Sequence, residues 1–355
     1  SCFFCFHDCE YTNLLNNPLS LSENFLILLN MYSDSEILKI IKNGISSLDL
    51  NKKPSGLYAP IEYIISVGGK RIRPRLALLT YNLFHRTIDQ KIIYPALALE
   101  IFHAYTLVHD DIMDKSDRRR GQLTIHKKWN ENTAILSGDV MSILAYKYLA
   151  YAPEESLSDV YALFTDTAIK VCEGQQYDMD FEKDPAITME EYEDMIGKKT
   201  AVLIACAAKL GALMAGVDDK VAQALYMFGY QLGMAFQITD DYLDVYADPN
   251  FFGKNVGEDI VDNKKSWMQV ETLRYSDESD KKRLFEIMSM SRDEADAKIS
   301  AMKEMYAKIG IKEHAEREIK KYYVSAMKSV EDIGLEEEKI NRLKNFAEML
   351  ITRKN

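Results

Sequence analysis

The segment "LVHDDIMDKSDRRRG" (residues 107–121) places three aspartates at the end of an apolar run and three consecutive arginines just beyond them. The residues before it, "EIFHAYTLV", are strongly apolar, so we expect residues 92–116 to form one core helix. In that helix Asp110 and Asp114 lie one turn apart on one face, with Asp111 about 100° around the axis. Carboxylates at this spacing repel one another unless a cation lies between them.

The same pattern occurs a second time. "MAFQITDDYLDVY" (residues 234–246) carries Asp240, Asp241 and Asp244, again inside an apolar helical stretch. One such motif is weak in a chain with 55 acidic residues among 355, but two copies in apolar helices can face each other across a bundle. Oxygen ligands suit Mg²⁺, which takes one or two carboxylates and completes its coordination with water and substrate phosphate. The pair of motifs therefore predicts a magnesium site between two helices.

Basic residues gather near these motifs although the protein as a whole is acidic. The arginines 118–120 and the stretch "GGKRIRP" (residues 68–74), with Lys70, Arg71 and Arg73, supply groups that bind diphosphate oxygens. The formal net charge of −11 and the pI near 5.2 argue against a nucleic-acid partner. The basic clusters therefore indicate a small anionic substrate.

The remaining sequence favours an all-α fold. Breakers are few, with 16 Gly and 8 Pro, and apolar residues recur at helical spacing without an alternating strand run. Ser33 and Glu36 have the spacing of a capping box. We expect a large helical bundle over residues 34–355, forming one domain, with residues 1–33 as an N-terminal extension. The helices are expected at roughly 56–66, 73–85, 92–116, 132–150, 157–181, 189–215 and 219–247, followed by shorter ones after Trp267.

Cysteine use and apolar runs indicate a cytoplasmic protein. Five cysteines, an odd number, do not make a disulfide framework, so we expect a reducing compartment. Cys2, Cys5, His7 and Cys9 match no standard zinc spacing. No apolar stretch reaches the ~18 uninterrupted residues that span a bilayer, since Lys209 interrupts the best candidate at residues 200–217. We therefore expect no transmembrane segment.

From about Gly68 to the C-terminus the chain resembles the trans-isoprenyl diphosphate synthases. The motifs stand in order: "GGKRIRP", "DDIMD" with "RRRG", "GKKT", "FQITDDYLD", "GKNVGEDIVDNK" and a basic tail. The resemblance implies head-to-tail (1'-4) condensation of isopentenyl diphosphate with dimethylallyl, geranyl or farnesyl diphosphate. Ionisation, condensation and elimination would depend on three Mg²⁺ ions bound with the allylic diphosphate. It also implies a homodimer and inhibition by bisphosphonate-like diphosphate mimics.

The resemblance also assigns expected roles to individual residues. The expected metal ligands are Asp110, Asp111, Asp114, Asp240, Asp241 and Asp244. The allylic diphosphate is expected on Arg119, Lys199, Gln237, Lys254 and Lys264, and isopentenyl diphosphate on Lys70, Arg73, His103, Arg120, Arg353 and Lys354. Lys199, Thr200 and Gln237 are the expected catalytic residues, and Gln175 and Asp178 form a polar pair opposite the first motif.

Parts of the pattern also occur in other classes of protein. Glu100 and His103 have the Glu-x-x-His spacing of di-iron bundles, but none of the six histidines supplies the second copy that such a site requires. A class I terpene cyclase typically pairs its aspartate motif with an Asn/Ser/Glu motif, whereas here the second motif is again aspartate. A non-catalytic partner subunit would be expected to lose one motif, and both are intact.

The residues before the first motif bear on product length. In the family, the residues four and five positions before the first aspartate form the floor of the pocket for the growing chain. Here they are Thr106 and Tyr105. Thr106 is too small to stop the chain, so we expect Tyr105 to act as a partial stop. The prediction is a substantial twenty-carbon product beside the fifteen-carbon one, with longer polyprenyl chains if Tyr105 turns aside. A neighbouring helix filling the gap is the alternative.

Overall fold

The structure is a computed structural model that describes residues 31–247 and 256–352. Its α-helices are α2 (Asp34–Ser46), α3 (Ser55–Ser66), α4 (Ile72–Asn82), α5 (Gln90–Met113), α6 (Ile125–Lys128), α7 (Glu131–Leu149), α8 (Glu154–Phe181), α9 (Met189–Ile196), α10 (Val202–Met214), α11 (Asp219–Tyr246), α13 (Glu258–Val261), α14 (Trp267–Tyr275), α15 (Glu278–Met288), α16 (Ala295–Ile309), α17 (Ile311–Glu331) and α18 (Glu337–Thr352). A π-helical turn, η1 (Gly197–Ala201), joins α9 to α10, and η2 (Arg292–Glu294) is a 3₁₀ turn. Two short strands, β1 (Arg118–Arg119) and β2 (Gln122–Leu123), form a hairpin.

The all-α fold is confirmed, and so is the capping box at the start of α2. The Ser33 hydroxyl accepts the backbone N–H of Glu36, while the Glu36 carboxylate accepts the backbone N–H of Ser33. Two local features differ from the sequence prediction. The helix expected over 189–215 contains the π turn η1. The helix expected over 92–116 ends earlier, at Met113, and the hairpin β1–β2 follows it. Both differences lie at the candidate site.

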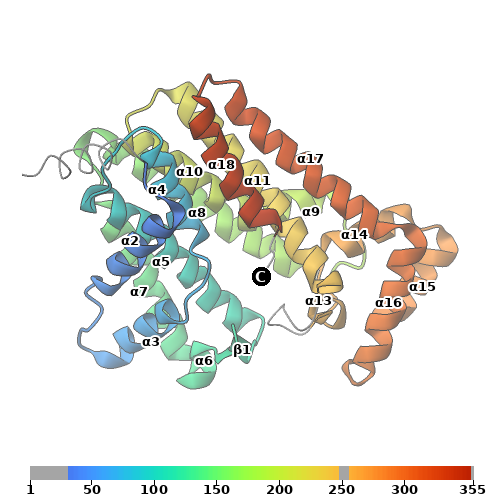
Figure 1. Cartoon of the computed structure of the whole chain (residues 1–355). Coiled ribbons are helices and arrows are strands. Elements are labelled where there is room, and N and C mark those ends of the chain that lie inside the picture. The colour runs from blue at the N-terminus through green and yellow to red at the C-terminus, as the bar shows by residue number, and fades with distance from the viewer. Residues whose placement is uncertain (1–30, 248–255, 353–355) are drawn as a thin grey trace, which may run out of the picture.

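The helices are arranged around α11, which runs through the middle of the bundle and packs against α10 and α17 (Figure 1). The apolar core has two parts. Leu225 and Phe228 of α11 belong to the part built from α2–α8, α10, α18 and the C-terminal half of α17. Met234 and Ile238, further along the same helix, belong to the part built from α9 and α14–α17. Because α11 contributes to both parts, the position of its C-terminal half is fixed by packing on both sides.

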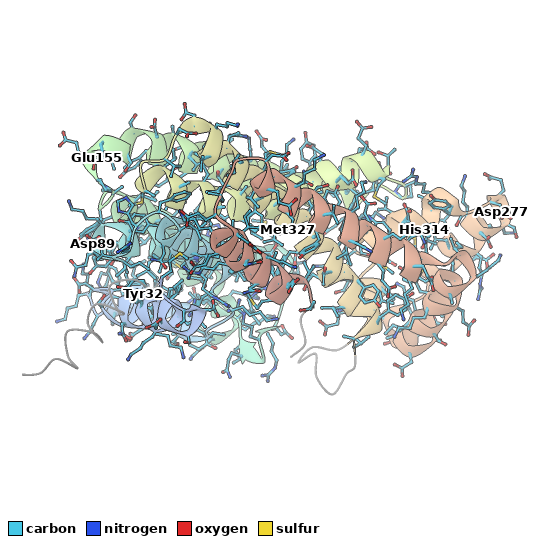
Figure 2. The ribbon with its side chains drawn as sticks, turned by 45° about the horizontal axis from the view of Figure 1, so that its top comes forward. Tyr32, Asp89, Glu155, Asp277, His314 and Met327 are labelled. Carbon is cyan, nitrogen blue, oxygen red and sulfur yellow. The ribbon has the colours of Figure 1, made fainter. Side chains whose placement is uncertain are left out.

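The two parts of the core give the protein an elongated outline. In Figure 2, Tyr32, Asp89 and Glu155 lie toward one end, and Asp277 and His314 lie toward the other. Met327 of α17 lies between them, on the helix that runs alongside α11. α17 therefore links the two parts of the core as α11 does.

One described helix, α5, has the length and apolar composition of a membrane span. However, 61% of its most apolar 18-residue window is buried against the rest of the protein. This burial is what a central core helix shows, and it agrees with the packing of α5 against α4 and α7.

A close helix crossing holds α11 in place against α10. A Cβ atom added at Gly229 would lie 2.7 Å from the Cα of Ala205 and 2.9 Å from the carbonyl oxygen of Ile204. Backbone atoms cannot rotate aside as a flexible side chain does, so only glycine allows this spacing. Gly229 lies about two turns before Gln237 and three turns before Asp240, which makes this contact relevant to the site described below.

We predict that Gly229→Leu lowers the free energy of unfolding by about 1–3 kcal/mol or more, because the added side chain forces α10 and α11 apart. Chemical denaturation followed by circular dichroism measures this change. Gly56→Ala on α3 is the matched control, because a Cβ there meets no atom within 4 Å. Equal stability of the Gly229→Leu variant and the wild type would show that the crossing tolerates separation.

Candidate active site

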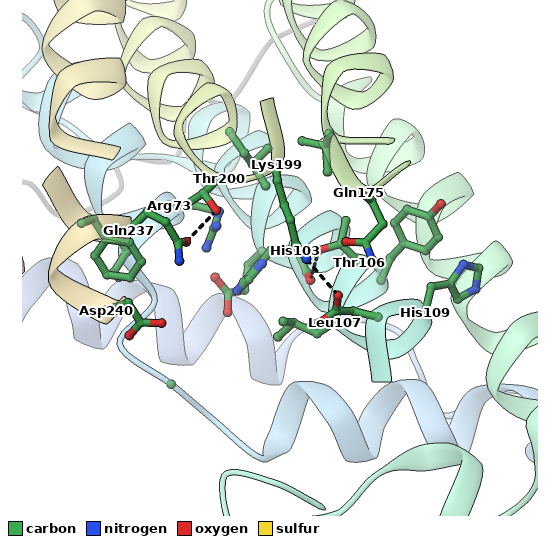
Figure 3. Close-up of a pocket in the computed structure, with 18 of the residues that line it drawn as sticks. Arg73, His103, Thr106, Leu107, His109, Gln175, Lys199, Thr200, Gln237 and Asp240 are labelled. Carbon is green, nitrogen blue, oxygen red and sulfur yellow. Dashed lines mark hydrogen bonds and ion pairs between the residues drawn. The ribbon is translucent and has the colours of Figure 1, made fainter. Parts of the chain in front are cut away.

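A large cavity of about 980 Å³ opens where α5, α8, η1 and α11 meet (Figure 3). Its lining combines charged groups with an apolar wall. The charged and polar lining residues are Lys70, Arg71, Arg73, Glu100, His103, His109, Asp110, Arg120, Gln175, Gln176, Lys199, Thr200, Gln237 and Asp240. The apolar wall includes Tyr105, Leu107, Met113, Val171, Cys172, Met179, Leu203, Phe236 and Leu243.

The aspartates of the first motif are bound by cations of this chain. Arg119 contacts Asp111 at 2.7 Å and Asp110 at 3.3 Å, Lys199 lies 3.4 Å from Asp110, and Lys264 lies 3.1 Å from Asp114. Burial raises the pKa of Asp110, but Lys199 and Arg119 outweigh it, so the net pKa lies below its usual value. For Asp111 burial prevails over Arg119, and the pKa is raised. Asp110 therefore remains an anion at neutral pH.

The hairpin after α5 directs two arginines to opposite sides. Arg120 and Gly121 have φ values of 52° and 75°, the backbone of a type I′ turn. This tight turn sends Arg119 back to Asp111. The guanidinium of Arg120 lies against Gly69, where an added Cβ would come within 2.4 Å of it. Consecutive arginines thus serve two different parts of the cavity.

The π turn η1 presents Lys199 and Thr200 together to the cavity. Such turns insert one residue into a helix and are frequent at functional sites. Helix α8 approaches this turn closely, since a Cβ at Gly174 would lie 2.3 Å from the backbone nitrogen of Lys199. From α8, Asp178 also contacts the Lys199 ammonium at 2.5 Å. Burial lowers the pKa of Lys199, but Asp110 and Asp178 outweigh it and raise the net pKa.

A second basic cluster lies at the N-terminal end of α4. Arg71 forms an ion pair of 2.6 Å with Glu100, whereas the buried Nε of Arg73 has no hydrogen-bond partner in the described residues. Burial lowers the pKa of Arg73 to about 10, so it stays charged at neutral pH. Burial, then Arg73 and Arg120, hold the pKa of His103 well below its usual value, so its imidazole is neutral. The cluster is suited to a multiply charged anion.

These contacts exclude the di-iron alternative. The Glu100 carboxylate is occupied by Arg71, and His103 is surrounded by arginines that would repel a metal cation. The pair with Glu-x-x-His spacing therefore belongs to the second basic cluster.

The second aspartate motif divides into three environments. Asp240 lines the cavity. Asp241 is buried away from it, accepting hydrogen bonds from Tyr192, Gln237 and the backbone of Trp267, and burial followed by nearby Asp259 raises its pKa to about 8. Asp244 accepts the backbone N–H of Asp259, the second residue of α13, at 3.3 Å.

The structure brings together most residues that the sequence predicted. Those lining the cavity are Lys70, Arg73, His103, Tyr105, Thr106, Asp110, Arg120, Gln175, Lys199, Thr200, Gln237 and Asp240. Asp111, Asp114, Arg119, Asp178 and Lys264 surround it and are joined to one another or to Asp110 and Lys199 by ion pairs. Lys254, Arg353 and Lys354 lie outside the described residues, as do Cys2, Cys5, His7 and Cys9.

The prediction that Asp241 is a metal ligand is not supported by the geometry. Both of its oxygens already accept hydrogen bonds from the protein, and the side chain does not line the cavity. The motif spacing could not reveal this, because adjacent residues of a helix point about 100° apart and only the packing decides which one faces inward.

Several lining residues were not predicted. Phe236 precedes Gln237, and Val171 and Cys172 lie one turn before Gln175 on α8. The helical period provides the missing signal, since residues three or four positions from a cavity residue share its face. Leu203 has the same signal, because it lies three positions after Thr200 and four after Lys199.

The donors present fit magnesium completed by a substrate. Within residues 31–247 and 256–352 no three Asp, Glu, His or Cys side chains converge into a closed metal cluster. Mg²⁺ does not require one, because it commonly uses one or two carboxylates together with water and substrate phosphate. Asp110 and Asp240 line the same cavity from two helices and have the appropriate chemistry. The ammonium and guanidinium groups beside them are suited to the phosphate oxygens.

Comparison with known proteins gives a consistent result. The polyprenyl synthetase family model matches residues 54–307. The chain is 39% identical over 263 residues to the short chain isoprenyl diphosphate synthase of Methanothermobacter thermautotrophicus, covering 74% of this chain and 80% of that protein. It is 34% identical to the geranylfarnesyl diphosphate synthase of Natronomonas pharaonis, covering 90% and 96%. A crystal structure of a geranylgeranyl pyrophosphate synthase superposes with a TM-score of 0.84 at 36% identity, covering 92% of this chain and 100% of the other. The chain therefore belongs to the polyprenyl synthetase family of prenyltransferases, the trans-isoprenyl diphosphate synthases.

Proposed function

We propose that this prenyltransferase condenses isopentenyl diphosphate with allylic diphosphates and releases a substantial twenty-carbon product beside the fifteen-carbon one. One observation carries the proposal: a single cavity has two separate groups of cations joined by an apolar wall. Each group is suited to one diphosphate, and the wall is suited to a hydrocarbon chain. The names of similar proteins, which include geranylgeranyl and geranylfarnesyl diphosphate synthases, support products of twenty carbons or more.

The first group of cations would hold the allylic diphosphate. Lys199 and Arg119 contact Asp110, and Lys264 contacts Asp114, so all three surround the carboxylates of α5. We propose that three Mg²⁺ ions bind here with the substrate, held by Asp110, Asp114, Asp240 and Asp244. Bound Mg²⁺ supplies Lewis-acid stabilisation of the departing diphosphate.

The second group would hold isopentenyl diphosphate. Lys70, Arg73 and Arg120 face the cavity, and neutral His103 can hydrogen-bond an oxygen without adding charge. The buried, unpartnered Nε of Arg73 gives such an anion a donor that is already desolvated.

The residues between the two groups suit the chemistry. Breaking the allylic C–O bond leaves an allylic cation, which the double bond of isopentenyl diphosphate attacks before a proton is lost to the departing diphosphate. The hydroxyl of Thr200 donates to the Gln237 carbonyl at 2.9 Å, and both residues line the cavity (Figure 3). Their oxygens place partial negative charge where the cation forms. The apolar wall keeps competing water from the cation.

The apolar wall supports the proposed product length. Tyr105 is held from two sides, because its ring packs 5.3 Å from that of Phe102 and 4.8 Å from that of His109. Its hydroxyl hydrogen-bonds the thiol of Cys172 on α8. Thr106 bonds its own helix, donating to the carbonyl of His103 at 2.8 Å, and leaves room in the cavity. A fixed Tyr105 beside a small Thr106 fits a partial stop.

An apolar surface supports a homodimer. Leu136 and Ile143, seven residues apart on one side of α7, are 57% and 66% exposed, and Ile169 on the next helix is 54% exposed. Large apolar side chains clustered on neighbouring helices are typical of protein interfaces. We propose that a second copy of the chain covers this face. We also propose a cytoplasmic location, because five cysteines do not make a disulfide framework.

We predict that turnover requires Mg²⁺ and stops in excess EDTA. Asp110→Ala and Asp240→Ala should each lower kcat by roughly a hundredfold or more, because each removes a carboxylate from the cavity. Circular dichroism should show unchanged helix content, since after the loss of Asp110 Arg119 keeps its contact with Asp111 and Lys199 keeps its contact with Asp178. Asp159→Ala, at an exposed position of α8, is the control and should be fully active. Undiminished turnover in excess EDTA would contradict a mechanism that requires Mg²⁺.

Product length should respond to the two residues before the motif. Thr106→Phe should shift the product toward fifteen carbons by filling the groove, and Tyr105→Ala should lengthen it, because each isoprene unit needs about one helical turn of free groove. Chromatography of dephosphorylated products from labelled isopentenyl diphosphate and each allylic primer measures the distribution. Wild-type protein that stops cleanly at fifteen carbons, with Tyr105→Ala unchanged, would mean that another helix sets the limit.

We predict that the protein is a dimer at micromolar concentration by light scattering. Ile143→Glu should yield a monomer of unchanged helix content, because the charge would be buried without a partner in the interface. Val324→Glu is the control, since Val324 is similarly exposed but lies on α17. A monomeric wild type, or dissociation by both substitutions alike, would contradict the proposed interface.

A further inference from the structure

The aspartate in the middle of the second motif has unusual surroundings for a member of an acidic cluster. Asp241 is 5% exposed, and three groups donate hydrogen bonds to its carboxylate. The Tyr192 hydroxyl and the backbone N–H of Trp267 donate to Oδ2 at 2.5 and 2.6 Å, and the side-chain amide of Gln237 donates to Oδ1 at 3.0 Å. Neighbouring Asp240 instead faces the cavity.

Three different helices fix the direction of this carboxylate. Tyr192 is on α9, Trp267 is the first residue of α14, and Asp241 itself is on α11. Tyr192 and Trp267 are 1% and 3% exposed, so water does not compete with either donor for the carboxylate. The N–H of Trp267 can only donate, which makes Oδ2 an acceptor. The carboxylate therefore has one orientation, with Oδ1 left for Gln237.

The contact with Gln237 has a consequence for the cavity. Gln237 and Asp241 are four residues apart, so they lie on the same face of α11. The two ends of a glutamine amide have nearly the same shape, and its partners decide which end points where. The Gln237 amide nitrogen donates to Oδ1 of Asp241 at 3.0 Å, so this contact selects the NH₂ end. The carbonyl oxygen is then directed to the Thr200 hydroxyl and the cavity.

We propose that Asp241 is a positioning residue, which holds the Gln237 amide with its oxygen toward the reacting carbon, and is not a ligand of the metal. The inference rests on the proposed function, because the oxygen serves the allylic cation. With the amide reversed, its NH₂ group would present positive hydrogen atoms to that cation and oppose its formation.

Asp241→Asn tests this role with the smallest change of shape. The asparagine oxygen can still accept from Tyr192 and Trp267, which turns its NH₂ group toward Gln237 and favours the reversed amide. We expect kcat to fall by roughly 10- to 100-fold. The Mg²⁺ concentration for half-maximal rate and the KM of the allylic substrate should stay within about twofold of wild type, since the metal site is intact.

Asp240→Asn is the matched control, an identical change at the adjacent position that faces the cavity. Calorimetric titration with Mg²⁺ and inorganic diphosphate supplies a readout that is independent of turnover. Asp240→Asn should weaken this binding, and Asp241→Asn should leave it unchanged. Equal weakening by both substitutions would show that Asp241 is a metal ligand and would overturn the inference.

A double-mutant cycle tests the link to Gln237 directly. Gln237→Ala removes the group that Asp241 positions, so adding Asp241→Asn should cause no further loss of kcat. If the double variant lowers kcat by the product of the two single effects, the inference is overturned. If Asp241→Asn does not fold, Tyr192→Phe replaces it, because it removes one donor far from the cavity and should lower kcat several-fold only while Gln237 is present. Absence of wild-type turnover would refute the proposed function instead, so the two failures are distinguishable.

Discussion

The structure of the site depends on the concentration of negative charge at the C-terminal ends of two helices. Asp110 lies in the last turn of α5, and Asp240 and Asp244 lie in the last two turns of α11. A helix C-terminus already carries partial negative charge, and neither helix has a basic residue in its last turn. The two ends therefore require cations from elsewhere in the chain. In the proposed function, diphosphate would bind to these cations and Mg²⁺ to the carboxylates.

The cations are brought to the site by the parts of the chain that are not regular helix. The hairpin β1–β2 directs Arg119, the π turn η1 presents Lys199, and the loop after α13 carries Lys264. Irregular backbone allows consecutive side chains to take directions that a straight helix forbids. The helices thus fix the positions of the carboxylates, and the irregular segments fix the cations around them.

The two aspartate motifs look alike in sequence but use their middle residues differently. In the first motif, Asp111 is buried against Arg119, so its charge is compensated by a cation. In the second motif, no cation among the described residues is in hydrogen-bond contact with Asp241, which is held by neutral donors from three residues. The pKa of Asp241, raised to about 8 by burial and Asp259, reflects this difference. In the second motif, Asp240 therefore faces the cavity while Asp241 accepts the amide of Gln237.

The sequence by itself determined the helical class, the approximate helix boundaries and the identity of the charged groups. Helical periodicity and capping act over a few residues, so they are visible in any short window, as at Ser33 and Glu36. The order of the motifs likewise predicted that Asp110, Asp240 and Lys199 belong to one site, and all three line the cavity. The hairpin could not be predicted, because two-residue strands have no period to detect. Only the tertiary structure decided which aspartates face the cavity, that Glu100 pairs with Arg71, and that Cys172 contacts Tyr105. These contacts join residues from different helices, and their geometry depends on how whole helices pack.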